Sequence, residues 1–204
     1  MKYRLAAMAG IFLAALLPSV SFGAASNGEN PQAAVAGGPH DFDFQFGQWR
    51  VHHRVKRPDN AQWVEFDGTS HVEPLMDGSA NVENNVFYKA AGISYGVALR
   101  TFDPKTRQWA IWWVDGRNPH AALDPAVKGQ FANGIGRFYS DGVLNGKPLR
   151  TRFLWSQITA TSAHWEQAYS FDQGKTWDTN WTMEFQRSSA LVPGAGAAAP
   201  VSSR

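Results

Sequence analysis

The chain alternates apolar and polar residues over many short stretches. Residues 49–56 read WRVHHRVK, so Trp, Val, His and Val alternate with Arg, His, Arg and Lys. Residues 177–187, WDTNWTMEFQR, repeat this two-residue period. Successive side chains on a strand point to opposite faces, so the pattern predicts sheet with one buried and one solvated face. No stretch of about 11 residues shows the helical period of 3.6.

Ten such stretches are predicted as strands, with Asp-, Gly- and Pro-bearing turns between them. They cover 48–56, 62–73, 80–90, 94–102, 107–114, 127–131, 134–140, 148–157, 162–171 and 178–187. Pro104 follows Asp103 at a turn position that suits its fixed φ. Asp141-Gly142 and Asn145-Gly146 are strong turn signals on either side of a weak segment, 143–144.

About ten strands in sequence predict an all-β fold, either an antiparallel up-and-down barrel or a two-sheet sandwich. We favour the barrel because it leaves no unpaired edge and because aromatic residues occur on most strands. Its tryptophans then converge in one lumen. Residues 41–47, DFDFQFG, carry Phe at every second position and predict a short helical turn or an extended plug with buried rings.

The N-terminus has the layout of a secretory signal peptide. Lys2 and Arg4 precede an apolar run over 5–17, and the small residues of 21–25 allow cleavage after Gly23 or Ala25. The alternative is a membrane anchor, but a run of about 13 residues is shorter than the roughly 20 that span a bilayer. We therefore expect a signal peptide over 1–25, a periplasmic or secreted protein, and no stable membrane insertion after its removal.

The remaining chain is predicted as one domain between two flexible segments. Residues 26–40 and 188–204 are rich in small residues without periodicity, which indicates a flexible linker and a disordered tail around the barrel domain, 41–187. With no Cys, the core has no disulfides. Without the signal peptide's Lys2 and Arg4, 17 of the 19 basic residues remain against 17 acidic ones. This balance gives no support to a nucleic-acid partner.

Two motifs carry a family resemblance. Gly47-Gln48-Trp49 opens the first strand and Arg187 closes the last. This resembles lipocalin-like barrels, in which the Trp closes one end and a basic residue packs across its indole. The string FDFQFGQWRV at 42–51 is similar to the opening of an uncharacterised family of bacterial, often secreted, lipocalin-like domains that begin FDFxxGxWxV.

A later pattern of that family, YDxxxxxWxxxWxD, is matched by Phe102-Asp103, Trp109, Trp113 and Asp115. The resemblance covers about 41–187. It implies a calycin-type barrel and no established activity or catalytic residues.

Some barrels with a similar opening motif bind haem, so haem is the cofactor to consider. Haem-binding nitrobindin barrels open with Gly-x-Trp-x-Gly-x-Gly, whereas Trp49 is followed here by Arg-Val-His-His. This departure argues against haem. His53 and His164 could ligate a metal or haem iron, but a lone His on a strand is more often packed or solvated. His52 and His53 point to opposite faces and cannot chelate one ion together. We predict neither a metal nor a cofactor.

Residues 170–177, SFDQGKTW, match the Asp-box S-x-D-x-G-x-T-W of sialidase propellers. We interpret it as a structural hairpin. Asp172 accepts hydrogen bonds from loop N–H groups, Gly174 permits a positive φ, and Trp177 fixes the hairpin to the sheet. A single copy in so short a chain does not predict a sialidase.

Five glutamates could perform acid–base chemistry: Glu65, Glu73, Glu83, Glu166 and Glu184. None accompanies a nucleophile motif or a metal-spaced His cluster. Alternation places Glu184 outside the barrel. We interpret all five as surface charge.

The inward aromatic residues are either ligand contacts or plain core filling. Arg100 shares a face with Gly96 and Ala98, opposite the more apolar face of Tyr95 and Leu99. Alternation thus favours an outward Arg100, whereas an inward one needs a carboxylate partner or an anionic ligand group. The predicted ligand-binding residues are Trp49, His53, Arg100, Trp113, Trp155, Tyr169 and Trp181.

These observations predict an exported barrel that binds a small, mostly apolar molecule. One alternative is a barrel-based isomerase or hydrolase of a hydrophobic molecule, and another is a ligand-free envelope interaction module. An apolar cavity of roughly 300 Å³ or more favours binding. Polar side chains that converge near an open mouth favour the enzyme, and a lumen packed solid favours the module.

Overall fold

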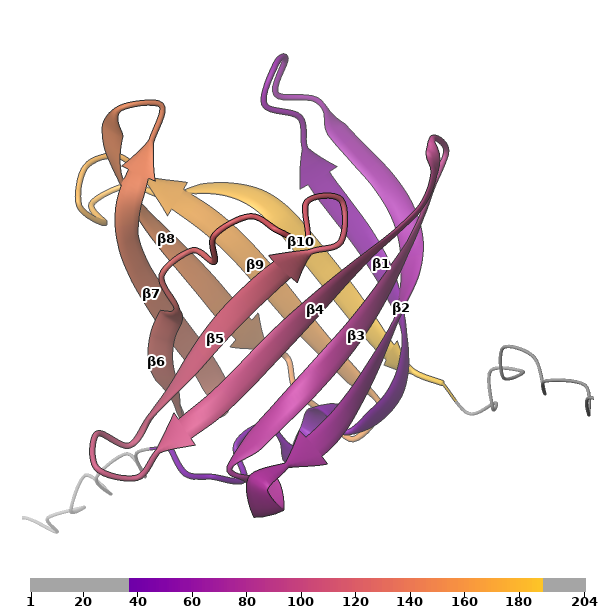
Figure 1. The fold of residues 1–204 in the computed structure, drawn as a ribbon, viewed down its shortest axis with the longest axis vertical. Coiled ribbons are helices and arrows are strands. Elements are labelled where there is room, and N and C mark those ends of the chain that lie inside the picture. Colours follow the sequence, from indigo (N-terminus) through magenta and orange to yellow (C-terminus); the bar gives the residue numbers. More distant parts are fainter. Residues whose placement is uncertain (1–36, 189–204) are drawn as a thin grey trace, which may run out of the picture. The chain divides into compact units, whose positions relative to one another are not determined.

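Ten antiparallel strands close into a barrel (Figure 1). The structure is a computed structural model that describes residues 37–188. Around the barrel the strands follow the order β1-β10-β9-β8-β7-β6-β5-β4-β3-β2, so neighbours in the sheet are also neighbours in the sequence except at the β1–β10 seam. The predicted all-β up-and-down barrel is confirmed. The predicted signal peptide (1–25), most of the linker and the tail from 189 lie outside the described residues.

Each predicted stretch corresponds to one strand. The strands are β1 (Gly47–Lys56), β2 (Trp63–Leu75), β3 (Ala80–Lys89), β4 (Gly92–Asp103), β5 (Gln108–Asp115), β6 (Val127–Ala132), β7 (Ile135–Leu144), β8 (Lys147–Ser156), β9 (Ser162–Ser170) and β10 (Asp178–Arg187). Two 3-10 turns accompany them, η1 (Asp43–Gln45) and η2 (Met76–Gly78).

The β7–β8 hairpin is longer than predicted. Asp141-Gly142, interpreted as a turn, pairs with Leu149 and Arg150 inside the ladder. The turn is Asn145-Gly146 alone, where φ is 51° and 77°. This suits the paired positive φ values of a two-residue hairpin. Residues 143–144, predicted as a weak segment between two turns, are therefore part of the strand. Val143 is 71% exposed near the hairpin tip.

The N-terminal segment closes one end of the barrel, the lower end in Figure 1. Contacts begin before the predicted boundary at 41, because Trp109 Nε1 donates to the Gly38 carbonyl oxygen at 3.1 Å. The 3-10 turn η1 then positions Phe42, which is fully buried. Its ring centroid lies 5.0 Å from those of Trp109 and Phe131, in edge-to-face contact. The segment is thus a plug built around a short helical turn.

Arg187 fastens this plug to the seam. Its guanidinium carbon lies 4.2 Å from the ring centroid of Trp49. Nη1 and Nη2 donate to the carbonyl oxygens of Phe46 and Phe44, at 2.7 and 2.5 Å, and Nε donates to that of Ala160 at 2.8 Å. One side chain therefore joins β10, the plug and the β8–β9 loop.

Arg187→Met should remove these three hydrogen bonds and the cation–π contact while keeping a long apolar stem. We expect the free energy of unfolding to fall by about 2 kcal/mol, measured by urea denaturation. Arg50→Met, an exposed change on neighbouring β1, is the control. A loss in Arg187→Met no larger than in this control would contradict the anchoring role.

Strand β4 faces the opposite way from its prediction. Alternation favours an outward Arg100, yet this residue is 3% exposed and points into the barrel, whereas Tyr95 and Leu99 are 55% and 40% exposed. The reason is Gly96: a Cβ there would lie 2.2 Å from Trp113 Cη2, so only glycine fits beside this inward indole. Because alternate residues share a face, Arg100 must then face inward as well.

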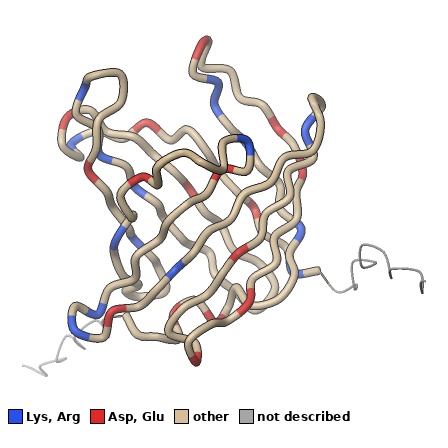
Figure 2. Tube along the Cα trace, viewed as in Figure 1, with Lys and Arg blue, Asp and Glu red and all other residues tan. Residues whose placement is uncertain are grey.

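Charged residues of both signs are interspersed over the described part of the chain (Figure 2). None of the helical segments within 37–188 is long and apolar enough to cross a membrane.

Candidate functional site

A cavity of about 580 Å³ occupies the lumen at the end opposite the plug. Side chains of β3–β5 and β8–β10 line its walls, and the β7–β8 hairpin and Asp124 and Pro125 of the β5–β6 loop line its rim. The plug end, in contrast, is filled by the packed rings around Phe42. The lumen is therefore solid at one end and hollow at the other.

Aromatic rings form one wall of this cavity. Trp165 contacts Phe153 at 5.0 Å and Trp181 at 5.7 Å between ring centroids. Trp181 on β10 also contacts Trp113 on β5 at 6.5 Å. Since β5 and β10 are not neighbours in the sheet, this last contact crosses the lumen and separates the cavity from the β1–β2 side.

A buried ion pair forms the deep polar end of the cavity. Arg100 Nη2 donates to Glu83 Oε2, and Arg100 Nη1 donates to Asn81 Oδ1 at 2.9 Å. Ser70 Oγ donates to Glu83 Oε1 at 2.6 Å. The guanidinium also lies 4.9 Å above the ring of Phe42. Each charge is therefore compensated, which is the condition for burying charges at modest cost.

Asn85 lies on the same inward face of β3, one inward position nearer the mouth than Glu83. It is 3% exposed and lines the cavity. Its register partner on β4 is Gly96, and that of Glu83 is Ala98. Trp113 packs over Gly96, whereas the small side chain of Ala98 lines the open space beside Glu83.

The polar side chains of β9 form a second group nearer the mouth. Gln167 Nε2 donates to Asn180 Oδ1 at 2.9 Å and to the Tyr169 hydroxyl at 3.3 Å. Burial, with a contribution from the charge of Asp124, raises the pKa of Tyr169. This tyrosine therefore stays protonated at neutral pH.

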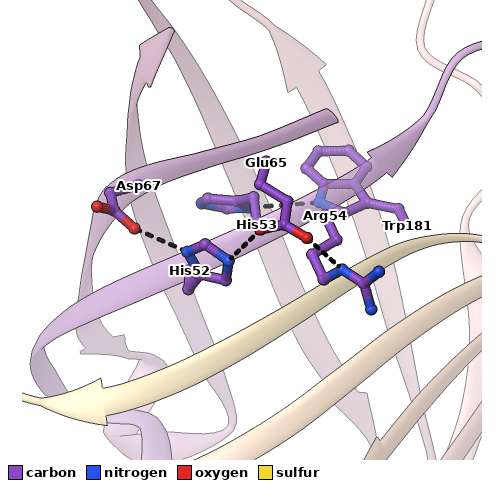
Figure 3. Close-up of polar contacts among 6 residues, drawn as sticks. All are labelled: His52, His53, Arg54, Glu65, Asp67 and Trp181. Carbon is purple, nitrogen blue, oxygen red and sulfur yellow. Dashed lines mark hydrogen bonds and ion pairs between the residues drawn. The ribbon is translucent and has the colours of Figure 1, made fainter. Parts of the chain in front are cut away.

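His53 does not line the cavity. It is hydrogen-bonded to Trp181, a member of the aromatic wall (Figure 3). Its ring is 1% exposed and stacks on Phe66 at 4.8 Å, and its Nδ1 accepts a hydrogen bond from Trp181 Nε1 at 3.3 Å. Burial, reinforced by the charge of Lys89, lowers the pKa of His53 to about 3. A neutral His53 thus supports Trp181.

His52 occupies the outer face (Figure 3). Its Nδ1 lies 2.9 Å from Asp67 Oδ1, and its Nε2 lies 3.5 Å from Glu65 Oε2. The other carboxylate oxygen of Glu65, Oε1, pairs with Arg54 Nε at 2.9 Å. The hydrogen bond to Asp67 raises the pKa of His52. The two adjacent histidines therefore differ in both face and charge behaviour.

His164 is also on the outer face, between Glu184 at 2.5 Å and Glu166 at 3.1 Å. Within residues 37–188, no group of three or more His, Asp or Glu side chains could hold a metal ion.

The Asp-box forms the β9–β10 hairpin. Asp172 Oδ2 accepts a hydrogen bond from Thr176 Oγ1 at 2.6 Å, and Oδ1 accepts one from the Thr176 N–H at 2.9 Å. These bonds lower the pKa of Asp172. Gly174 has a φ of 90°, and Arg152 lies 4.6 Å from the ring of Trp177 on the outer surface.

The structure brings most of the predicted ligand-binding residues together. Five of them line the cavity: Arg100, Trp113, Trp155, Tyr169 and Trp181. Trp49 does not, because it belongs to the Arg187 closure, and neither does His53, which is hydrogen-bonded to Trp181.

Sequence reasoning missed the polar β3 residues. Glu83 was grouped with surface charges, yet it is buried with Arg100, and Asn85 was not considered. The signal was the pair of small residues Gly96 and Ala98, since the face that carries the smallest side chains suits a crowded lumen.

No protein-family model and no curated protein matches the chain. Among solved structures, that of the S-type phycobiliprotein lyase CpeS from Guillardia theta is similar, with a TM-score of 0.49 and 10% identity over 74% of this chain and 92% of that chain. At this identity and TM-score the likeness carries no conclusion about function.

Proposed function

We propose that this protein binds a small, mostly apolar molecule in its lumen. The observation that carries the proposal is the cavity of about 580 Å³ with its wall of Phe153, Trp165 and Trp181. Sites for small ligands in proteins are concave, mostly apolar and roughly 300–1,000 Å³ in volume. The open half of the lumen supports binding over a solidly packed interaction module.

The engagement of Glu83 supports binding over catalysis. Both of its carboxylate oxygens are held, by Ser70 and by Arg100. A carboxylate that bridges these two donors belongs to the buried ion pair, whereas a general base is positioned against a substrate proton. The other carboxylates of the lining, Asp124 and Asp141, lie at the exposed rim. The polar group near the mouth consists of two amides and a phenol, and no carboxylate or imidazole of the described residues is hydrogen-bonded to them.

The test is the fluorescence of N-phenyl-1-naphthylamine, an uncharged probe that brightens in apolar sites. Ala98, 4% exposed and part of the lining, offers a position to block the cavity. We expect Ala98→Phe to weaken probe binding at least about tenfold by filling that space. Val97→Phe makes the same substitution on the outer face of β4 and should bind like the parent.

Thermal unfolding verifies that both variants are folded. A parent protein that leaves the probe dark, or an Ala98→Phe variant that binds as tightly as the parent, would contradict the proposal.

We further propose that the chain is exported to the periplasm or the medium. The support is the order of residue types over 1–25, in which basic residues come first, an apolar run follows, and small residues come last.

A further inference from the structure

We infer that the ligand carries one uncharged oxygen group, a hydroxyl or a carbonyl, that hydrogen-bonds Asn85, and that the cavity discriminates against carboxylates. This inference rests on the proposed function and names the chemical class that the same cavity takes. It follows from two observations: in the described part of the chain the side-chain amide of Asn85 has no hydrogen-bond partner, and the charge of Arg100 is compensated by Glu83.

Asn85 is the free group. Its side chain is 3% exposed overall and faces the cavity, and within residues 37–188 no partner hydrogen-bonds its amide. Glu83, Asn81 and Ser70, which surround it on β3 and β2, are hydrogen-bonded to one another or to Arg100. A ligand that covers this amide without pairing with it leaves a buried unsatisfied group, which costs about 1–3 kcal/mol. A ligand oxygen that hydrogen-bonds the amide avoids that cost.

Arg100 does not attract an anion, although it is the cation of the lining. Nη1 and Nη2 are engaged by Asn81 and Glu83, and its Nε is enclosed beyond the reach of a ligand. The other charged residues of the lining are the carboxylates Asp124 and Asp141. A ligand carboxylate would therefore enter a desolvated space with no free cation and with Glu83 at its end, which is costly. A ligand ammonium would also lose its hydration there, because Glu83, the carboxylate at that depth, is already paired with Arg100.

The experiment compares four probes of one shape at pH 7.5 by displacement of N-phenyl-1-naphthylamine. They are 2-naphthalenemethanol, 2-naphthoate, 2-naphthylmethylamine and 2-methylnaphthalene. We expect the alcohol to bind at least about tenfold more tightly than the naphthoate, because the carboxylate must be desolvated without a partner. Asn85→Leu, similar in shape, should weaken the alcohol about fivefold without weakening 2-methylnaphthalene.

The variant Glu83→Gln tests the second part of the inference, the discrimination against carboxylates. Removing the carboxylate that compensates Arg100 should improve binding of 2-naphthoate about tenfold relative to the alcohol. If this variant does not fold, Asn85→Leu alone decides the question.

Naphthoate binding as tight as that of the alcohol, amine binding tighter than both, or an alcohol affinity unchanged in Asn85→Leu would each overturn the inference. So would a parent that binds N-phenyl-1-naphthylamine and none of the four probes. A parent that binds no probe at all would instead overturn the proposed function.

Discussion

Arg100→Met should lower the free energy of unfolding by about 4 kcal/mol, because it leaves the Glu83 carboxylate buried without its counter-charge. The two side chains are 3% and 4% exposed, so water cannot take over the role of the missing partner. Asn81 also loses a hydrogen-bond donor. Urea denaturation at pH 7.5 measures the effect.

The double variant Arg100→Met/Glu83→Leu tests the cause. Replacing both partners by apolar residues removes the uncompensated charge, so the double variant should be more stable than Arg100→Met by about 2 kcal/mol or more. Losses that simply add, or a single variant within 1 kcal/mol of the parent, would show that the pair is not coupled as described.

Acid should destabilise the protein well above the range in which carboxylates titrate, and His53 should account for it. Its pKa is about 3 in the folded protein and about 6.5 in the unfolded chain, so the unfolded chain takes up a proton first as the pH falls. The stabilisation is complete above pH 6.5 and is lost towards pH 3. Between pH 7.5 and 4.5 we expect a loss of about 3 kcal/mol.

His53→Gln keeps a polar acceptor for Trp181 but does not titrate, so it should flatten this slope. His52→Gln is the matched control. The raised pKa of His52 gives a stabilisation that is present below pH 6.5 and is lost as the pH rises through its folded pKa. Its removal should therefore steepen the acid loss. Equal slopes in the parent and in His53→Gln would refute the assignment.

The strands could be predicted from alternation, because a sheet with one solvated face imposes a period of two on the sequence. Their up-and-down order could be predicted from the turns that join consecutive strands. The facing of β3 and β4 could not. It depends on which strands pair and at what register, since Glu83 on β3 and Arg100 on β4 become tolerable inside only when they meet. From alternation alone, each of these two charged residues is predicted to face the solvent.

The sequence also does not predict which half of the lumen is packed and which half is open. Aromatic residues occur along the whole length of the strands, and their pattern does not distinguish Trp109, packed against the plug, from Trp165, which lines the cavity. That difference arises from where the segment 37–46 folds back, and from the small side chain of Ala98, which lines the open space.

The β1–β10 seam also bears on how the chain folds. Every other strand pairing joins strands that are consecutive in the chain, whereas the seam brings Trp49 and Arg187 together from opposite ends of the domain. Loop-closure entropy grows with the logarithm of the length of chain enclosed, so the seam is the costliest single closure of the barrel. Its contacts raise the contact order of the fold, and a higher contact order slows refolding.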